Sequence, residues 1–140
     1  MSPRVEIAGV FSGVDESDPR SLSVDEFVVL VNTGAEPAQL AGWSLSKLKT
    51  DQRHHFRYIF PRFMSNGESW VLEPGGMVIL YTGRGTNGAT ATEGEAHQYH
   101  LYQHRSAPIW VDPGDRVCLQ DRTGRVMATL DLPVAPRRAN

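Results

Sequence analysis

The chain has 140 residues, of which 40% are hydrophobic and 21% charged, and its formal net charge is −2. This length suits a single domain with one core, and the near-neutral charge excludes a surface that attracts nucleic acid or membrane as a whole. The one cysteine, Cys118, excludes an internal disulfide and a zinc site built from several cysteines.

Targeting signals are not evident in the sequence. The first residues, MSPRVEIAGVFSG, lack the basic and apolar regions of a signal peptide, and no stretch approaches the roughly 18 apolar residues of a membrane span. We therefore expect a cytoplasmic protein without membrane contact. An extracellular location is the alternative if the chain has been trimmed.

Short apolar runs separated by Gly, Pro, Asn and Asp dominate the chain. Many of them are rich in β-branched residues or alternate between apolar and polar positions, as strands do, and no long stretch repeats apolar residues at helical spacing. The pattern predicts one all-β domain over residues 3–132, a sandwich or a barrel, followed by a disordered tail at 133–140. The runs are, in chain order, 5–10, 26–32, 40–45, 55–60, 77–82, 115–121 and 125–130.

Several segments, taken in order, resemble the lamin tail domain family. They are DEFVVLVNTG, LAGWSL, the Phe60–Pro61 pair, LEPGGMVILYTGRGTNG, RSAPIW and GDRVCLQDRTGRV. The resemblance implies an immunoglobulin-like β-sandwich of two antiparallel sheets that serves as a non-catalytic interaction or scaffold module. It also implies structural roles in the core and at turns for Gly42, Trp43, Trp110, Gly114 and Asp115.

Residues 47–62 form a basic segment in which aromatic residues interleave with the cations. Basic groups bind phosphates and exposed aromatic rings stack on bases, so this segment could bind nucleic acid. The alternative is a strand whose aromatic residues Phe56, Tyr58 and Phe60 face inward while its basic residues face solvent. Some lamin tail domains are implicated in contacts with DNA and chromatin, but we favour a protein partner bound through loops or a strand edge. The candidate contact residues are Lys47, Lys49, Arg53, His54, Arg57 and Arg62.

Three histidines, His97, His100 and His104, have the spacing of ligands on one face of a helix. On a helix they could bind one metal ion. On a strand, His97 and His100 point to opposite faces, and His100 and His104 lie about 13 Å apart. The local pattern fits either structure, and the family resemblance favours extended chain. We therefore expect no metal site, and keep a metal-binding protein as the second alternative.

The remaining motifs predict neither catalysis nor a cofactor. GRGTNG at 83–88 matches the glycine pattern of a dinucleotide-binding turn, but the following ATATEGEA has no apolar stripe to form the packed helix that such a site needs. Asp112 and Asp115 flank a Pro-Gly pair and are typical of a turn. Cys118 is expected to be a buried structural thiol. We expect a protein that is not an enzyme and holds no cofactor.

Overall fold

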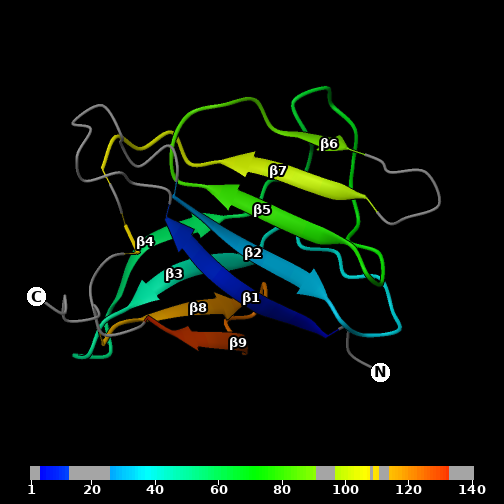
Figure 1. Ribbon diagram of the computed structural model, residues 1–140. Coiled ribbons are helices and arrows are strands. Elements are labelled where there is room, and N and C mark those ends of the chain that lie inside the picture. The colour runs from blue at the N-terminus through cyan, green and yellow to red at the C-terminus, as the bar shows by residue number, and fades with distance from the viewer. Residues whose placement is uncertain (1–3, 13–25, 91–96, 108, 111–113, 133–140) are drawn as a thin grey trace, which may run out of the picture.

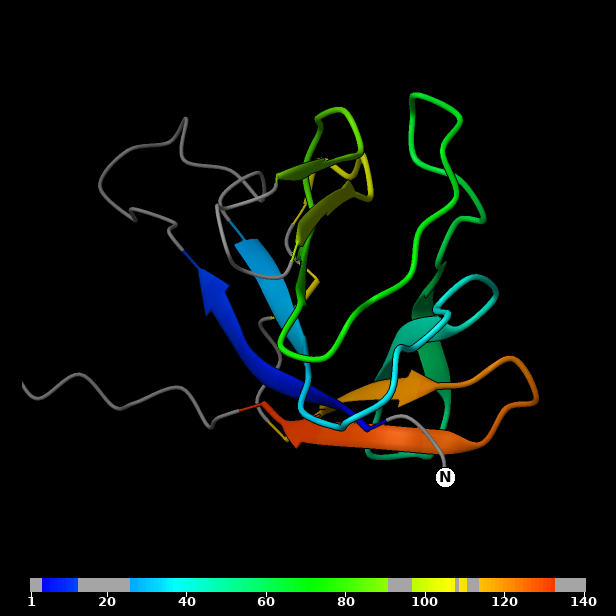
Figure 2. The ribbon, with the colours of Figure 1, turned by 90° about the vertical axis from the view of Figure 1, so that its right-hand side faces the viewer.

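The computed structural model describes residues 4–12, 26–90, 97–107, 109–110 and 114–132. Nine strands in these ranges form two sheets, which Figure 2 shows as separate layers (Figure 1, Figure 2). The tail at 133–140, predicted to be disordered, lies outside the described residues. The strands are β1 (Val5–Ser12), β2 (Glu26–Asn32), β3 (Ser44–Leu48), β4 (His54–Ile59), β5 (Met77–Tyr81), β6 (Gly88–Thr90), β7 (Gln98–Tyr102), β8 (Arg116–Gln120) and β9 (Val126–Asp131).

The two sheets have five and four strands, in the orders β1-β2-β5-β7-β6 and β4-β3-β8-β9. Strands β1 and β9 contact each other along one side of the sandwich, and β4 is the far edge of the smaller sheet. This arrangement confirms the predicted immunoglobulin-like β-sandwich. The larger sheet differs from the predicted antiparallel sheet in one detail: β5 and β7 pair in parallel, while the other described pairs are antiparallel.

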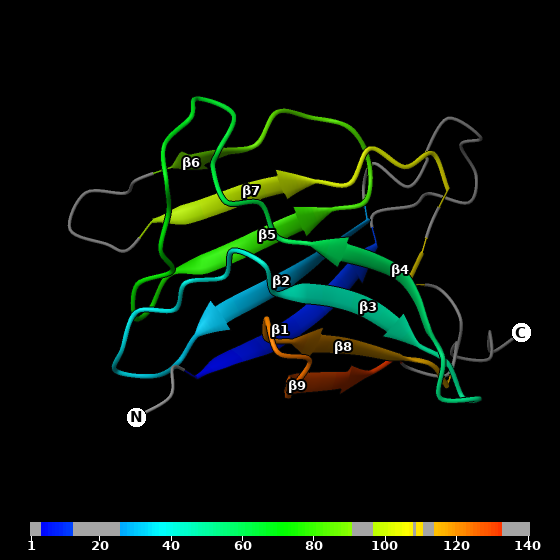
Figure 3. The same ribbon diagram turned by 180° about the vertical axis from the view of Figure 1, so that it is seen from behind.

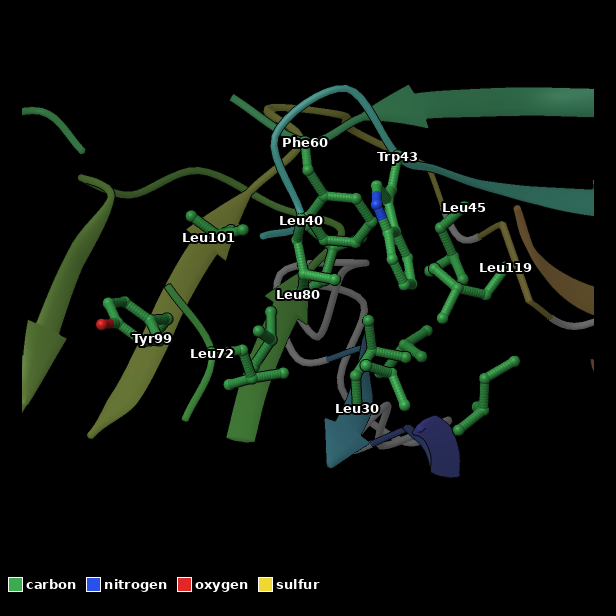
Figure 4. Close-up of a cluster of buried hydrophobic side chains, with 14 of the residues drawn as sticks. Leu30, Leu40, Trp43, Leu45, Phe60, Leu72, Leu80, Tyr99, Leu101 and Leu119 are labelled. Carbon is green, nitrogen blue, oxygen red and sulfur yellow. The ribbon is translucent and has the colours of Figure 1, made fainter. Parts of the chain in front are cut away.

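The core fills the space between the sheets, and β2, β5 and β7 contribute to it through alternating buried and half-buried positions. In β2 the alternation is complete, and Val28 and Leu30 are fully buried. Leu80 and Leu101 of the larger sheet point toward Trp43 and Phe60 (Figure 4). No helix in the described ranges is long and apolar enough to cross a membrane.

The outer face of the larger sheet carries a row of aromatic residues at matched register. Each residue of the row lies directly opposite the next one on the neighbouring strand: Phe11 on β1, Phe27 on β2, Tyr81 on β5 and Tyr102 on β7. Their ring centroids are 5.2, 5.6 and 4.7 Å apart in that order. Cross-strand aromatic pairs of this kind stabilise a sheet. Because the rings largely stack on one another, the row is a stabilising element of the sheet.

One glycine of the GRGTNG motif supports this row. A Cβ on Gly85 would overlap the ring of Tyr102, which stacks on Tyr81. We expect Gly85→Ala to lower the free energy of unfolding by about 1–3 kcal/mol, because the ring has to leave its stack. Urea unfolding measures this loss. Gly88→Ala is the matched control, since a Cβ there meets nothing within 4 Å. An equal loss in both variants would contradict the packing role of Gly85.

Candidate functional site: the edge strand β4

Among the described strands, β4 is an edge strand that pairs with β3 alone, and Figure 3 shows it along the margin of its sheet. Five of its six residues are exposed, and Tyr58 is half-buried. Desolvation raises the pKa of Tyr58 to about 12. An edge strand offers unpaired backbone N–H and C=O groups to another chain. β4 is therefore a candidate interaction site.

A bulge interrupts the pairing of β3 with β4. Leu45 lies opposite Tyr58 and Lys47 lies opposite His55, so Phe56 and Arg57 together oppose one residue, Ser46. Phe56 has a φ of 55°, a left-handed conformation that bulky residues rarely adopt.

This bulge removes Phe56 from the predicted inward face, whereas Tyr58 packs against the core and Phe60 is buried as expected. Phe60 is 1% exposed, but Phe56 is 42% exposed. The strict two-residue alternation on which the prediction rested ends at the extra residue. Phe56 is therefore a surface aromatic group.

Two of the predicted contact residues are engaged within the protein. Lys47 is 3% exposed, because it shares the inner face of β3 with Leu45, and its Nζ donates to the carbonyl oxygen of Ile109 at 2.9 Å. It cannot reach a partner at the surface, so its assignment as a contact residue was wrong. Lys49 is half-buried, and its Nζ lies 3.3 Å from Oδ2 of Asp115.

The other predicted contact residues are exposed. Arg53 lies in the turn before β4, with its Nε 3.9 Å from Oδ2 of Asp51. His54 has its Nδ1 2.8 Å from Oγ of Ser46, and desolvation, with a smaller contribution from the charge of Arg57, lowers its pKa. Arg57 reaches over the outer face of the smaller sheet, with Nη1 3.5 Å from Oγ of Ser44.

Arg62 lies beyond the end of β4, apart from the residues of the strand. It is exposed and lines a shallow depression together with Arg122 of the β8–β9 turn. The exposed cations that belong to β4 and its preceding turn are thus Arg53 and Arg57, with His54 between them.

The residues expected to have structural roles lie in the core or at turns. Trp43 and Trp110 are 7% and 5% exposed, and Asp115 is 4% exposed. Gly42 and Gly114 have φ values of 85° and 87°, which favour glycine.

Sequence reasoning missed Glu26, the first residue of β2. Its side chain is 1% exposed. The carboxylate accepts hydrogen bonds from Oγ1 of Thr82 at 2.6 Å and from the backbone nitrogens of Ile109 and Trp110 at 2.9 and 3.2 Å. An acidic residue before an apolar run is typical of an exposed strand end, so no local signal identifies this one as buried.

The histidine spacing does not correspond to a helix, because residues 98–102 form strand β7. His100 points outward and its ring stacks near that of Tyr81, with centroids 6.1 Å apart. Across the described residues, no group of three or more His, Cys, Asp and Glu side chains is placed to hold a metal ion.

Two other motifs have structural roles. The GRGTNG loop leads into strand β6. Cys118 is buried on β8, and its burial raises the pKa of the thiol.

The paired sheets and their shared core place the protein in the class of immunoglobulin-like β-sandwich modules. The model of the Lamin Tail Domain family matches residues 2–133. The chain therefore belongs to the lamin tail domain family, whose members are generally non-enzymatic modules. None of the curated proteins compared with the chain matches it.

Proposed function

We propose that this protein is a non-catalytic interaction module that binds an extended segment of a partner protein along the free edge of β4. The observation that carries the proposal is the exposure of two large apolar side chains on an edge strand, Ile59 at 62% and Phe56 at 42%. Bulges and basic residues are also found on edge strands that are protected against pairing with another chain. Exposed apolar side chains do not contribute to such protection. A partner that covers them removes apolar surface from water.

The backbone of β4 is suited to strand addition near Ile59. The backbone N–H and C=O of Phe60 both point toward β3: the N–H donates to the carbonyl oxygen of Trp43, and the C=O accepts from the backbone nitrogen of Gly42. In an antiparallel ladder the backbone N–H and C=O of the neighbouring residue point to the opposite side of the strand. The N–H and C=O of Ile59 are therefore available to a partner strand. The nearby charges of Arg53 and Arg57 favour an acidic partner segment.

Nucleic acid is the second candidate partner, and the exposure of Phe56 is the observation that favours it. An exposed ring beside arginines can stack on a base. Two observations favour the protein partner instead. Lys47 is buried and Lys49 is paired with Asp115, so the basic segment presents fewer cations to phosphates than its sequence indicates.

The test uses affinity capture of partners by the tagged chain from a nuclease-treated lysate of its own organism. The captured protein is then titrated against Ile59→Lys and Val126→Lys variants. Val126 is the matched control, because it is 53% exposed on the other edge strand of the same sheet. We expect Ile59→Lys to weaken binding at least tenfold and Val126→Lys to change it less than twofold.

Three outcomes would contradict edge binding. Equal losses in both variants would mean that the partner covers the outer face of the smaller sheet, where Ile59, Ser44, Gln120 and Val126 form one row. Unchanged binding in both variants would place the interface elsewhere. Capture that depends on nucleic acid and is lost after nuclease treatment would favour the second candidate.

A further inference from the structure

Three segments of the chain meet at one end of the smaller sheet. Ser44, the first residue of β3, lies opposite both Ile59 of β4 and Gln120 of β8. Strands β4 and β8 therefore run toward the same end of the sheet, and their arrowheads point in the same direction in Figure 3. The turn before β3, the residues after β4 and the β8–β9 turn thus lie side by side at this end.

Two open depressions of about 310 and 360 Å³ lie among these segments, and both are lined by Ala41, Arg62 and Arg122. Because they share these three residues, we treat them as one surface, the arginine depression. The first is completed by Gln39, Ser69, Trp70 and Val71, and the second by Gly42 and Phe60. Two exposed arginines from distant parts of the chain therefore border one concave surface.

Arg122 is held in place at the depression. Its Nη2 donates to the carbonyl oxygen of Ala41 at 3.1 Å, and a Cβ on Gly42 would lie 3.4 Å from its Nε. The neighbouring carboxylate of Asp121 is engaged within its own turn, where Oδ1 accepts from the backbone nitrogen and the hydroxyl of Thr123 at 2.8 and 2.7 Å. A guanidinium that is already positioned loses less entropy when it binds a ligand.

The backbone is also fixed on both sides of Arg62. The carbonyl oxygen of Pro61 accepts from Nε1 of Trp70 at 2.8 Å, and Phe63 forms a β-bridge with Ser69. The Arg62 side chain itself is exposed. Among the described residues, neither Arg62 nor Arg122 forms an ion pair with a carboxylate. Both positive charges are therefore available to an anion.

The chemistry of the depression favours a phosphate monoester. Two guanidinium groups that border one surface repel each other, and a bound anion relieves this repulsion. A phosphate monoester carries about two negative charges and three acceptor oxygens at neutral pH, whereas a carboxylate offers one charge and two oxygens. The hydroxyl of Ser69 and the amide of Gln39 add neutral donors to the lining. Two forked guanidinium groups match the phosphate in both charge and number of oxygens.

We infer that the arginine depression binds a phosphorylated side chain of the partner segment that pairs with β4. The inference rests on the proposed function and adds regulation to it, because phosphorylation of the partner would raise its affinity. Arg62 follows Ile59 by three residues, at most about 11 Å along the chain. A partner strand that lies beside Ile59 and continues past the end of β4 reaches the depression within about three further residues.

The first test uses N-acetyl-phosphoserine methylamide, which carries the phosphate but has no segment that could pair with β4. It is titrated into the isotope-labelled full chain while the Nε–Hε signals of Arg62 and Arg122 are followed by NMR. We expect saturable shifts of both signals and binding about fivefold or more tighter than that of N-acetyl-glutamate methylamide.

Variants test whether the two arginines form the site. Arg62→Gln and Arg122→Gln should each weaken binding of the phosphoserine derivative about fivefold or more. Arg125→Gln is the matched control, because it removes an exposed arginine of the same β8–β9 turn, and it should change binding less than twofold. Absence of binding would overturn the inference. Equal losses in all three variants would overturn it as well, because they would show a general attraction between charges.

The partner captured in the test of the proposed function separates the two proposals. Phosphatase treatment of this partner should weaken its binding about fivefold or more to the unmodified protein, and less than twofold to Arg62→Gln. Binding that Ile59→Lys weakens and phosphatase does not would overturn the inference and leave edge binding intact. Phosphatase-sensitive binding that Ile59→Lys does not weaken would overturn edge binding alone. A single-stranded oligonucleotide that binds more tightly than the phosphoserine derivative, and less tightly to Arg62→Gln, would assign the depression to nucleic acid instead.

Discussion

Replacing Glu26 with alanine should lower the free energy of unfolding by about 3–5 kcal/mol. The substitution leaves the hydroxyl of Thr82 and the amides of Ile109 and Trp110 without their acceptor. Hydrogen bonds to a charged group are stronger than neutral ones, and each buried donor left unsatisfied adds its own desolvation penalty. Urea unfolding followed by tryptophan fluorescence measures the loss.

Two further variants control this prediction. Glu68→Ala removes an exposed glutamate and should change stability by no more than about 0.5 kcal/mol. Glu26→Gln keeps the shape and one acceptor oxygen but turns an NH₂ group toward a donor, so its loss should be intermediate. A Glu26→Ala protein within about 1 kcal/mol of the unmodified protein would show that the three donors find other acceptors.

Glu26 also connects the core to the proposed interaction site. Its carboxylate accepts from the nitrogen of Ile109, whose carbonyl oxygen in turn accepts from Nζ of Lys47. Lys47 lies over the ring of Phe56. A buried carboxylate on the larger sheet thus holds the segment that positions a buried ammonium group beneath the surface of β4.

The strands that could be predicted from the sequence are those in which one apolar run, bounded by turn residues, spans the whole strand. Strand β2 has the predicted bounds 26–32, and β5 and β8 differ from their predicted runs only by a residue at the ends. The run 40–45 was only partly right, because Gly42 forms a turn with a φ of 85° and the strand begins at Ser44. A turn of this kind interrupts an apolar run without changing its composition.

The site was harder to predict because its features depend on distant partners. The bulge at Phe56 requires the register between β3 and β4, which no local pattern contains. Lys47 and Glu26 are charged and buried, whereas a charged residue is ordinarily assigned to the surface. Their partner Ile109 lies 62 and 83 residues away in the chain, respectively. Only the folded arrangement shows that these charges belong to the interior.

Phe60→Ala is the second substitution with a large expected effect, a loss of about 3–5 kcal/mol. The Phe60 side chain is 1% exposed and lies beside Leu40 and Trp43 in the core (Figure 4). Its ring packs edge-on against Tyr58, with centroids 5.2 Å apart, and lies 6.4 Å from the ring of Trp70. Alanine would leave a cavity among groups that the strands hold in place.

Phe63→Ala is the matched control, because it makes the same chemical change three residues later at a side chain that is 52% exposed. Its loss should stay below about 1 kcal/mol in the same unfolding experiment. Similar losses in the two variants would contradict the assignment of Phe60 to the core.

Substitutions at the neighbouring residues Phe60 and Ile59 allow effects on stability to be distinguished from effects on partner binding. Phe60 faces the core, and the strand alternation then directs Ile59 to the surface at 62% exposure. Phe60→Ala should therefore weaken partner binding only to the extent that it unfolds the protein. Ile59→Lys should weaken binding while leaving the unfolding transition nearly unchanged. Loss of both properties in Ile59→Lys would mean that Ile59 supports the fold, and the apolar edge of β4 would then no longer indicate a binding site.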